Sequence, residues 1–194
     1  MNIRDLSIIN DNIKPNLIYR SSEISSISDL TLIKDYKIKN IIDFRNNYEK
    51  NLNDYSKLLP DNIRYISIPI EIDHAKKLYE GTPMESVYQY FALDCKEMYK
   101  MILKQIINID GSILLSCRYG MDRTGVMIAI IHLICNTPIH KIIEDYLQTG
   151  LIIVKTHIEI FLNILNTQNG ISEFFKNQLT NNEIELIRSK LLKS

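Results

Sequence analysis

The chain has 194 residues, of which 45% are hydrophobic and 24% are charged. These proportions are typical of a globular protein with one domain, here residues 1–194, and they exclude a disordered chain, a collagen and a disulfide-stabilised miniprotein. The 23 basic and 23 acidic residues cancel. No overall field therefore attracts nucleic acid or an anionic membrane, and an anion must be bound by a local device.

The three cysteines, Cys95, Cys117 and Cys135, show no C-x-x-C spacing and no histidine cluster beside them. We therefore expect neither a disulfide framework nor a metal site, and no cofactor. Cys95 and Cys135 lie in segments of helical periodicity and are expected to be core thiols. The sparse cysteines and the polar N-terminus favour a reducing cytoplasm, with export by a non-standard route left open. No apolar run reaches 18 residues, so no membrane span is expected.

Strand-like and helix-like segments alternate through the first part of the chain. Short β-branched or alternating runs are typical of strands, and apolar residues three or four apart are typical of helices. In chain order these patterns predict a short apolar run (17–19), a helix with Ser28 as its N-cap (28–36), a strand (38–44), a helix (47–59), an alternating strand (64–70) and an exposed loop (71–81).

Helices dominate the second part. Thr82 as N-cap, Pro83 at the first helical position and Glu85 as capping-box partner start a long helix, whose apolar period continues through Ile106. The remaining predicted elements are a turn (110–111), a buried strand (112–116), a loop (117–123), an apolar helix (124–135), a helix beginning at 137–138 and further amphipathic helices, the last with Thr180 and Glu183 at capping-box spacing.

This order predicts an α/β fold with a central, mainly parallel sheet of four to five strands, flanked by helices, and a helical C-terminal third. In such sheets ligands bind beyond the carboxyl ends of the strands. The junction of Ser116 and Cys117 lies at such an end, which makes the following loop the first candidate for a functional site.

The segment SCRYGMDRTG, residues 116–125, has the composition of an anion cradle. A loop that leaves a strand and enters a helix at once can point several backbone amides at one centre, completed by the helix N-terminus. Arg123 adds a planar fork that can pair two phosphate oxygens. Gly120 permits a crowded backbone, and Gly125 permits close packing behind the loop.

The same field favours the thiolate form of Cys117, because helix N-termini and neighbouring cations stabilise the anion. A thiolate at the base of a phosphate-sized cradle can attack phosphorus in line and form a phosphocysteine that water later hydrolyses. Asp122, inside the loop, is the first choice for general acid and then base, with Asp73 in the loop after the third strand as the rival. Thr124 could hydrogen-bond the sulfur.

At this point the sequence resembles the Cys-dependent protein tyrosine phosphatase superfamily, whose signature is C-x5-R followed by Ser or Thr. The closer resemblance is to the bacterial tyrosine and lipid phosphatase branch with the loop HCxxGKDRTG. Four further motifs of that branch occur here in the same order: NIRDL (2–6), IYRS (18–21), IDFR (42–45) with Glu49, and DYLQT (145–149).

The resemblance implies a phosphatase fold, no metal, and hydrolysis of phosphotyrosine-type or phosphoinositide monoesters, on a phosphorylated protein or a small molecule. Carried over by position, Cys117 is the nucleophile, Arg123 the phosphate clamp and Asp122 the acid. Asp43 and Arg45 would lie near the loop at the end of a neighbouring strand, where they either support the loop or form only a structural ion pair.

Two positions depart from the branch. Ser116 replaces the histidine that helps to set the ionisation of the cysteine, and Met121 replaces the lysine associated with phosphoinositide recognition. Arg118 partly restores the lost charge, and Tyr119 could pack against an aromatic or inositol ring. Around the substrate we therefore expect a set of five loop residues: Arg118, Tyr119, Gly120, Met121 and Gly125.

Two other functions compete with a phosphomonoesterase. The two departures could leave a catalytically weak module that binds phosphate without turning it over. A rhodanese-type sulfurtransferase also places a loop cysteine before a helix, although Arg123 and the candidate acid Asp122 favour chemistry at phosphorus.

Overall fold

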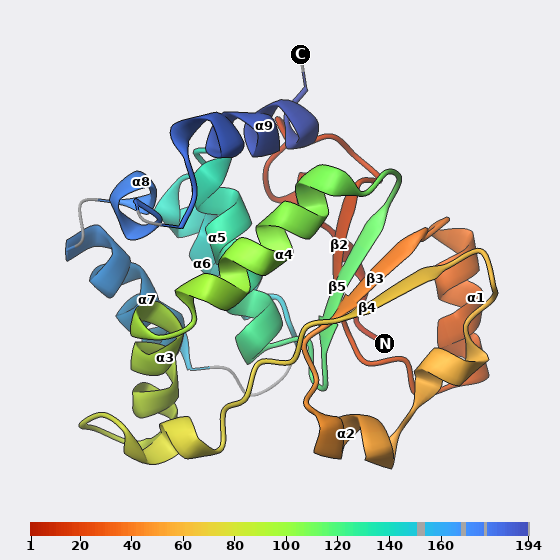
Figure 1. Cartoon of the computed structure of the whole chain (residues 1–194), viewed down its shortest axis with the longest axis horizontal. Coiled ribbons are helices and arrows are strands. Elements are labelled where there is room, and N and C mark those ends of the chain that lie inside the picture. The colour runs from red at the N-terminus through yellow and green to blue at the C-terminus, as the bar shows by residue number, and fades with distance from the viewer. Residues whose placement is uncertain (151–153, 168–169, 177, 194) are drawn as a thin grey trace.

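The described part of the chain, residues 1–150, 154–167, 170–176 and 178–193 of a computed structural model, contains one five-stranded sheet. The strand order is β1-β2-β5-β3-β4 (Figure 1). β1 pairs with β2 in antiparallel fashion and the other pairs are parallel, which confirms the predicted mainly parallel α/β sheet. The strands are Arg4–Asp5 (β1), Ile18–Ser22 (β2), Asn40–Asp43 (β3), Arg64–Ser67 (β4) and Ile113–Cys117 (β5).

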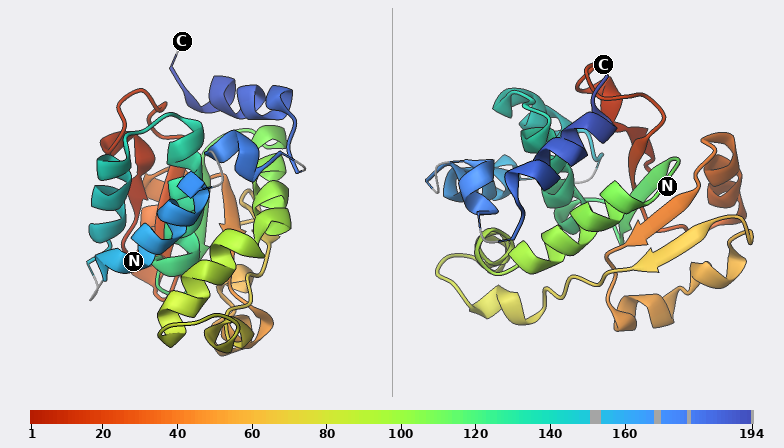
Figure 2. Two further views of the ribbon diagram at one scale, coloured as in Figure 1. Left: turned by 90° about the vertical axis from the view of Figure 1, so that its left-hand side faces the viewer. Right: turned by 45° about the horizontal axis from the view of Figure 1, so that its top comes forward.

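Successive residues of the central strands face opposite layers, as the period of two requires. Leu114 of β5 joins a small core cluster with residues of α1 (Ile27–Asp35). Its neighbours Ile113 and Leu115 join the large core built with the C-terminal helices. In Figures 1 and 2, α1 lies on one side of the sheet, and α4 (Lys96–Asn108) and α5 (Asp122–Ile134) lie on the other.

The remaining helices complete the two layers and the helical C-terminal third. They are α2 (Asn47–Leu52), α3 (Pro83–Leu93), α6 (Ile139–Leu147), α7 (Lys155–Thr167), α8 (Ile171–Phe174) and α9 (Asn181–Leu191). The predicted capping boxes of α3 and α9 are both present. No helix in the described ranges is long and apolar enough to cross a bilayer.

Helix α1 has its N-cap two residues earlier than predicted, so the assignment of Ser28 as N-cap is wrong. Ser26 is the N-cap: its hydroxyl accepts from the amide of Asp29 at 3.2 Å, and the Asp29 carboxylate accepts from the amide of Ser26 at 3.1 Å. This reciprocal pair is a capping box. Ser28 lies inside the first turn.

Two predicted helices are broken. The helix predicted over 47–59 is α2 followed by a 3-10 turn, Tyr55–Leu58, because Asn53 is extended and its side chain donates to the carbonyl of Ile24 at 2.9 Å. The long helix predicted from Pro83 ends at Leu93, and α4 begins at Lys96. Cys95 is the N-cap of α4, and Cys135 is the C-cap of α5; both are buried.

Smaller differences concern short elements. Residues 71–81 were predicted as a loop but include a 3-10 turn, His74–Lys77, that buries Ala75. Helix α5 begins at Asp122, two residues before the predicted start. β1 has only two residues, too few for any periodic signal.

Candidate active site

The loop after β5 lies at the carboxyl edge of the sheet, between the ends of β2 and β3. β5 is the central strand, and Ser116 pairs in register with Ser21 on one side and Asp43 on the other. The chain then passes through residues 118–121 into α5. Cys117, at the strand end, is only 2% exposed. This is the edge at which parallel sheets bind ligands.

Backbone amides that donate no hydrogen bond line this loop in the part of the chain that the structure describes. The amides of residues 118–121, 123 and 124 donate to no acceptor within the described residues. Gly120 has a φ of +67°, and a Cβ there would lie 2.5 Å from backbone atoms of Ser21 and Ser22. Only glycine allows β2 and the loop to approach this closely. The tight winding leaves a set of donors suited to an anion at the N-terminus of α5.

Arg123 is buried and held in one orientation. Its Nη1 donates to Glu49 Oε2 and its Nη2 to Glu49 Oε1, both at 2.6 Å, and Nη1 also donates to the Phe44 carbonyl at 3.3 Å. These bonds occupy both hydrogens of Nη1 and one hydrogen of Nη2. Within the described ranges, the Nε–H group and the second Nη2–H group remain free to bind a ligand. Burial alone would lower the pKa of Arg123, but the bond to Glu49 and the charges of Cys117 and Glu49 raise it. The fork is therefore a permanent cation.

Glu49 is a residue of the candidate site to which sequence patterns assigned no role, although one of the quoted motifs contains it. It is the N3 residue of α2, where its carboxylate also accepts from the amide of Asn46 at 3.0 Å. Burial acts to raise the pKa of Glu49, but the hydrogen bond and charge of Arg123 outweigh it and lower the pKa. The capping box of α2 thus fixes the carboxylate that fixes Arg123.

The two candidate acids, Asp122 and Asp73, border the same cavity but differ in environment. Asp122 is the first residue of α5, and its Oδ1 accepts from the hydroxyl of Tyr88 at 2.7 Å. Burial raises the pKa of Asp122. Asp73 has a side chain 74% exposed, and its ion pair with Lys76 at 2.8 Å lowers its pKa. Asp122 therefore holds a proton more readily than Asp73.

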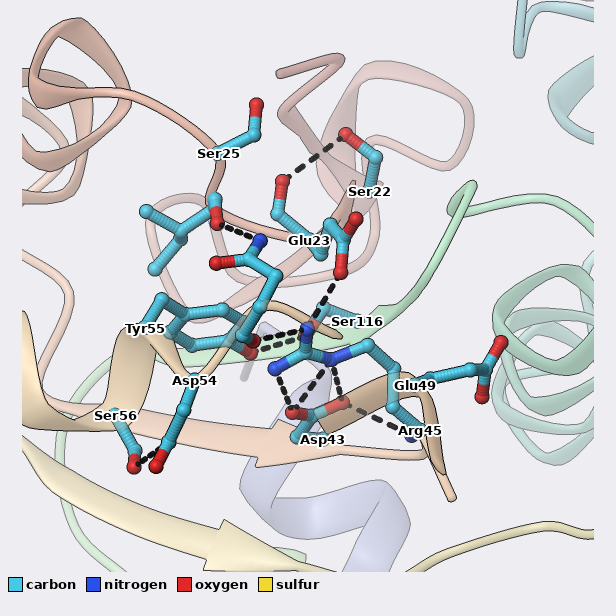
Figure 3. Close-up of polar contacts among 12 residues, drawn as sticks. Ser22, Glu23, Ser25, Asp43, Arg45, Glu49, Asp54, Tyr55, Ser56 and Ser116 are labelled. Atoms are coloured by element: carbon cyan, nitrogen blue, oxygen red, sulfur yellow. Dashed lines mark hydrogen bonds and ion pairs between the residues drawn. The ribbon is translucent and has the colours of Figure 1, made fainter. Parts of the chain in front are cut away.

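Asp43 and Arg45 form a fully buried ion pair behind the loop, and Arg45 also pairs with Glu23 at 2.5 Å (Figure 3). Arg45 Nε lies 3.0 Å from Asp43 Oδ2, and the Tyr65 hydroxyl donates to the same oxygen at 2.7 Å. The guanidinium also covers the ring of Tyr55 at 4.3 Å. In the close-up, Glu49 points away from this cluster.

Ser116 connects that cluster to β5, the strand that ends at Cys117. Its hydroxyl lies 3.3 Å from the hydroxyl of Tyr55, and its carbonyl accepts from the amide of Phe44 at 2.8 Å. Burial raises the pKa of Tyr55 well above its usual range, so the phenol is neutral. The residue before the cysteine is therefore held by a phenol rather than by a charged group.

The N-terminal and post-loop motifs meet on the other side of the loop. Arg20 is buried, pairs with Asp145, and donates to the Gly120 carbonyl at 2.8 Å and to Thr149 Oγ1 at 3.2 Å. Arg4 donates to the carbonyl of Asp145 at 2.6 Å. The motifs NIRDL, IYRS and DYLQT thus form one network behind Gly120.

A cavity of about 490 Å³ opens over the loop. Loop residues in its wall are Arg118, Tyr119, Met121, Asp122 and Arg123, and among the others are Tyr48, Glu49, Asp73, Lys76, Met84, Tyr146 and His157. Arg123 is paired with Glu49 and Lys76 with Asp73. Within the described residues, Arg118 is the cation of this wall without a carboxylate partner.

Thr124 and Gly125 lie behind the cavity in the first turn of α5. Thr124 Oγ1 is buried and has no hydrogen-bond partner in the described ranges. A Cβ on Gly125 would lie 2.8 Å from the ring of Tyr146, so this glycine allows α5 and α6 to pack closely. In the residues that the structure describes, no group of three or more His, Cys, Asp or Glu side chains is arranged to hold a metal ion.

Comparisons with known proteins place this chain in a family. The tyrosine phosphatase family matches residues 1–193. A search of curated proteins found no match. The fold is similar to that of TpbA from P. aeruginosa, at 14% identity and a TM-score of 0.53 over 92% of this chain and 91% of that chain.

It is also similar to the core catalytic domain of the PP-IP phosphatase SIW14 from S. cerevisiae in complex with citrate, at 18% identity and a TM-score of 0.54 over 92% of this chain and 91% of that chain. A further structure of the Siw14 catalytic core has 20% identity and a TM-score of 0.56 over 93% of this chain and 91% of that chain. At these identities the solved structures show the fold alone. The family match along the whole sequence carries the assignment: the chain belongs to the tyrosine phosphatase family and is a phosphomonoesterase.

Proposed function

We propose that this chain hydrolyses aryl phosphomonoesters, with phosphotyrosine as the substrate class, through a phosphocysteine at Cys117. The observation that carries the proposal is the fixed fork of Arg123, held by two 2.6 Å bonds to Glu49 beside a loop of unpaired amides. Such a site is organised for a phosphoryl group before any substrate arrives. The family match favours phosphorus over sulfur transfer.

In the first step, Cys117 Sγ attacks phosphorus in line and the bond to the leaving oxygen breaks. The loop amides and the free Nε–H and Nη2–H of Arg123 bind the equatorial oxygens. Asp122 gives its proton to the leaving oxygen. In the second step water attacks phosphorus, Asp122 takes a proton from the water, and the sulfur leaves as a thiolate that the Thr124 hydroxyl can stabilise by hydrogen bonding.

Asp122 is preferred to Asp73 as the acid because the environment of each carboxyl decides its charge. A general acid must hold its proton near the working pH. Burial raises the pKa of Asp122, whereas Lys76 lowers the pKa of Asp73. Asp73 is therefore better suited to holding Lys76 than to giving up a proton.

The wall of the cavity favours an aryl phosphate over a phosphoinositide. A phosphoinositide head group carries several phosphates and needs several free cations, but Arg123 and Lys76 already face carboxylates and Arg118 is left. Tyr48 and Tyr119, which are 68% and 52% exposed, line the same cavity, and the Arg118 guanidinium lies over the Tyr119 ring, 5.3 Å from its centroid. Aromatic rings pack well on one another, so these two side chains suit the ring of an aryl phosphate.

A substrate panel tests the proposal. We expect kcat/KM to be highest for phosphotyrosine peptides and other aryl phosphates, and lower for a phosphoserine peptide and a soluble phosphoinositide. Cys117→Ser should abolish turnover and retain vanadate binding. Unchanged turnover in that variant would refute the nucleophile, and binding without turnover in the wild type would indicate the phosphate-binding module. A preference for the phosphoinositide would overturn the substrate class.

A second comparison decides the acid. Asp122→Asn should reduce turnover most for substrates with poor leaving groups, because these need the proton most. Asp73→Asn is the matched control and should lack that dependence. If Asp73→Asn alone shows it, Asp122 is not the acid.

A further inference from the structure

We infer that Tyr88 is a positioning residue for the general acid: its hydroxyl engages one oxygen of Asp122, so that the other oxygen carries the transferable proton. Tyr88 lies in α3, 34 positions before Asp122, and its place in an apolar helical period gave no sign of this contact. The inference rests on the proposed role of Asp122.

The hydrogen-bond directions follow from the number of protons. Tyr88 Oη lies 2.7 Å from Asp122 Oδ1 and 2.6 Å from Tyr146 Oη. A phenol has one proton, and Tyr88 donates it to the carboxylate. The proton between the two phenols must then come from Tyr146. The chain of donors runs from Tyr146 to Tyr88 to Asp122.

Two facts make Tyr88 a positioning residue rather than a catalytic one. Tyr88 is fully buried and is not part of the cavity wall, whereas Asp122 and Tyr146 are. Its own proton stays in place, since burial raises the pKa of Tyr88 well above its usual range. With Oδ1 occupied as an acceptor, a protonated Asp122 carries its hydrogen on Oδ2.

Charged and titratable groups reach Asp122 from several elements. Tyr88 comes from α3, Tyr146 from α6, His157 from α7 and Arg123 from its own helix, while Asp73 and Lys76 border the same cavity. The ring of His157 is stacked on that of Tyr88, with centroids 5.3 Å apart. Burial raises the pKa of Asp122, and the bond from Tyr88 and the charges of Arg123 and His157 oppose that rise.

Tyr88→Phe removes the hydroxyl and keeps the ring. A donor to the carboxylate is then lost, so the pKa of Asp122 should rise, and the fall of kcat/KM at high pH, where the acid loses its proton, should move to higher pH by about one unit. Turnover of substrates with poor leaving groups should also fall, by about tenfold, because the acid is less well oriented. Activated aryl phosphates should be turned over at close to the wild-type rate.

Three comparisons separate this inference from a structural effect and from the proposed function. Tyr90→Phe, on the same helix, is the matched control and should leave the pH profile in place. In the Asp122→Asn background, Tyr88→Phe should have no further effect. Tyr146→Phe removes only the donor to Tyr88, so it should shift the pH profile of kcat/KM in the same direction by a smaller amount. If Tyr88→Phe does not fold, this variant tests the inference in its place.

A profile in Tyr88→Phe that coincides with the wild type would overturn the inference. So would an equal loss of kcat for all leaving groups, or a full effect in the Asp122→Asn background. Activity that survives Cys117→Ser would instead refute the proposed function itself, so the two failures are distinguishable.

Discussion

Glu49 and Arg123 face one another edge to edge, with both nitrogen–oxygen distances at 2.6 Å. The two residues come from different layers of the fold, Glu49 from α2 and Arg123 from α5. The pair is largely buried, with side chains 11% and 4% exposed, and both residues border the cavity over the loop. The orientation of Arg123, the proposed phosphate clamp, thus depends on the start of α2 as much as on the loop.

Glu49→Gln tests this dependence. An amide offers one acceptor and a donor in place of two acceptors, so the parallel pair of bonds cannot form. We expect kcat/KM for an aryl phosphate to fall by about 100-fold, because a small displacement of a clamp costs that much. The measurement is steady-state kinetics with the inhibition constant of vanadate. Asp54→Asn, an exposed carboxylate paired with Lys57, is the control; wild-type kinetics in Glu49→Gln would contradict the dependence.

Gly120→Ala tests the contact between the loop and β2. The added Cβ would meet the backbone of Ser21 and Ser22 at 2.5 Å, at a φ of +67°. We expect a loss of about 1–3 kcal/mol in the free energy of unfolding, measured in urea, together with a loss of activity.

Gly170→Ala provides the control for that variant. Gly170 also has a positive φ, +88°, but nothing lies within 4 Å of its Cβ position. It therefore has the backbone strain without the collision. Equal effects of the two substitutions would mean that the approach of the loop to β2 is unimportant.

Local patterns sufficed to predict the loop, because its signals lie within a few residues of one another. The loop joins four features that lie close together in the chain: the apolar strand β5, Cys117, Arg123 and the start of α5. The N-cap of α1 could also have been found: Ser26 and Asp29 have capping-box spacing, whereas Ser28 has no such partner.

Long-range partners could not be predicted in this way. Arg20 donates to the carbonyl of Gly120, 100 positions later, and Glu49 holds Arg123, 74 positions later. No periodicity links such residues. The break between α3 and α4 was missed for the opposite reason, because the apolar period continues through Cys95 while the helix does not.

Arg118→Ala tests the recognition of charge at the rim of the cavity. Arg118 has no carboxylate partner among the described residues, and a free cation attracts acidic side chains near a phosphotyrosine. KM should rise several-fold for a phosphotyrosine peptide with acidic neighbours, and the effect should weaken at high salt. A small aryl phosphate should be almost unaffected. Lys77→Ala is the control; an equal rise in KM for both substrates would exclude a role in reading the flanking residues.

His132 makes stability depend on pH in a definite direction. The imidazole is fully buried, its Nδ1 lies 3.0 Å from Thr137 Oγ1, and burial, despite the opposing charge of Asp145, lowers the pKa to about 4. A histidine in an unfolded chain titrates near 6.5. Between these values the unfolded chain binds a proton that the native protein does not, so the free energy of unfolding must decrease as the pH falls from about 6.5 to about 4.

The slope from this one group is at most about 1.4 kcal/mol for each pH unit, and it vanishes below about pH 4, where both states bind the proton. Urea unfolding of the wild type and of His132→Asn between pH 4 and 7.5 measures it. The substitution removes the titrating group and keeps a polar atom near Thr137, while carboxylates remote from His132 titrate in both proteins and cancel in the difference. The two stability curves should converge as the pH falls through this window, because only the wild type loses the contribution of His132; curves that stay parallel would mean that His132 is protonated in the folded protein.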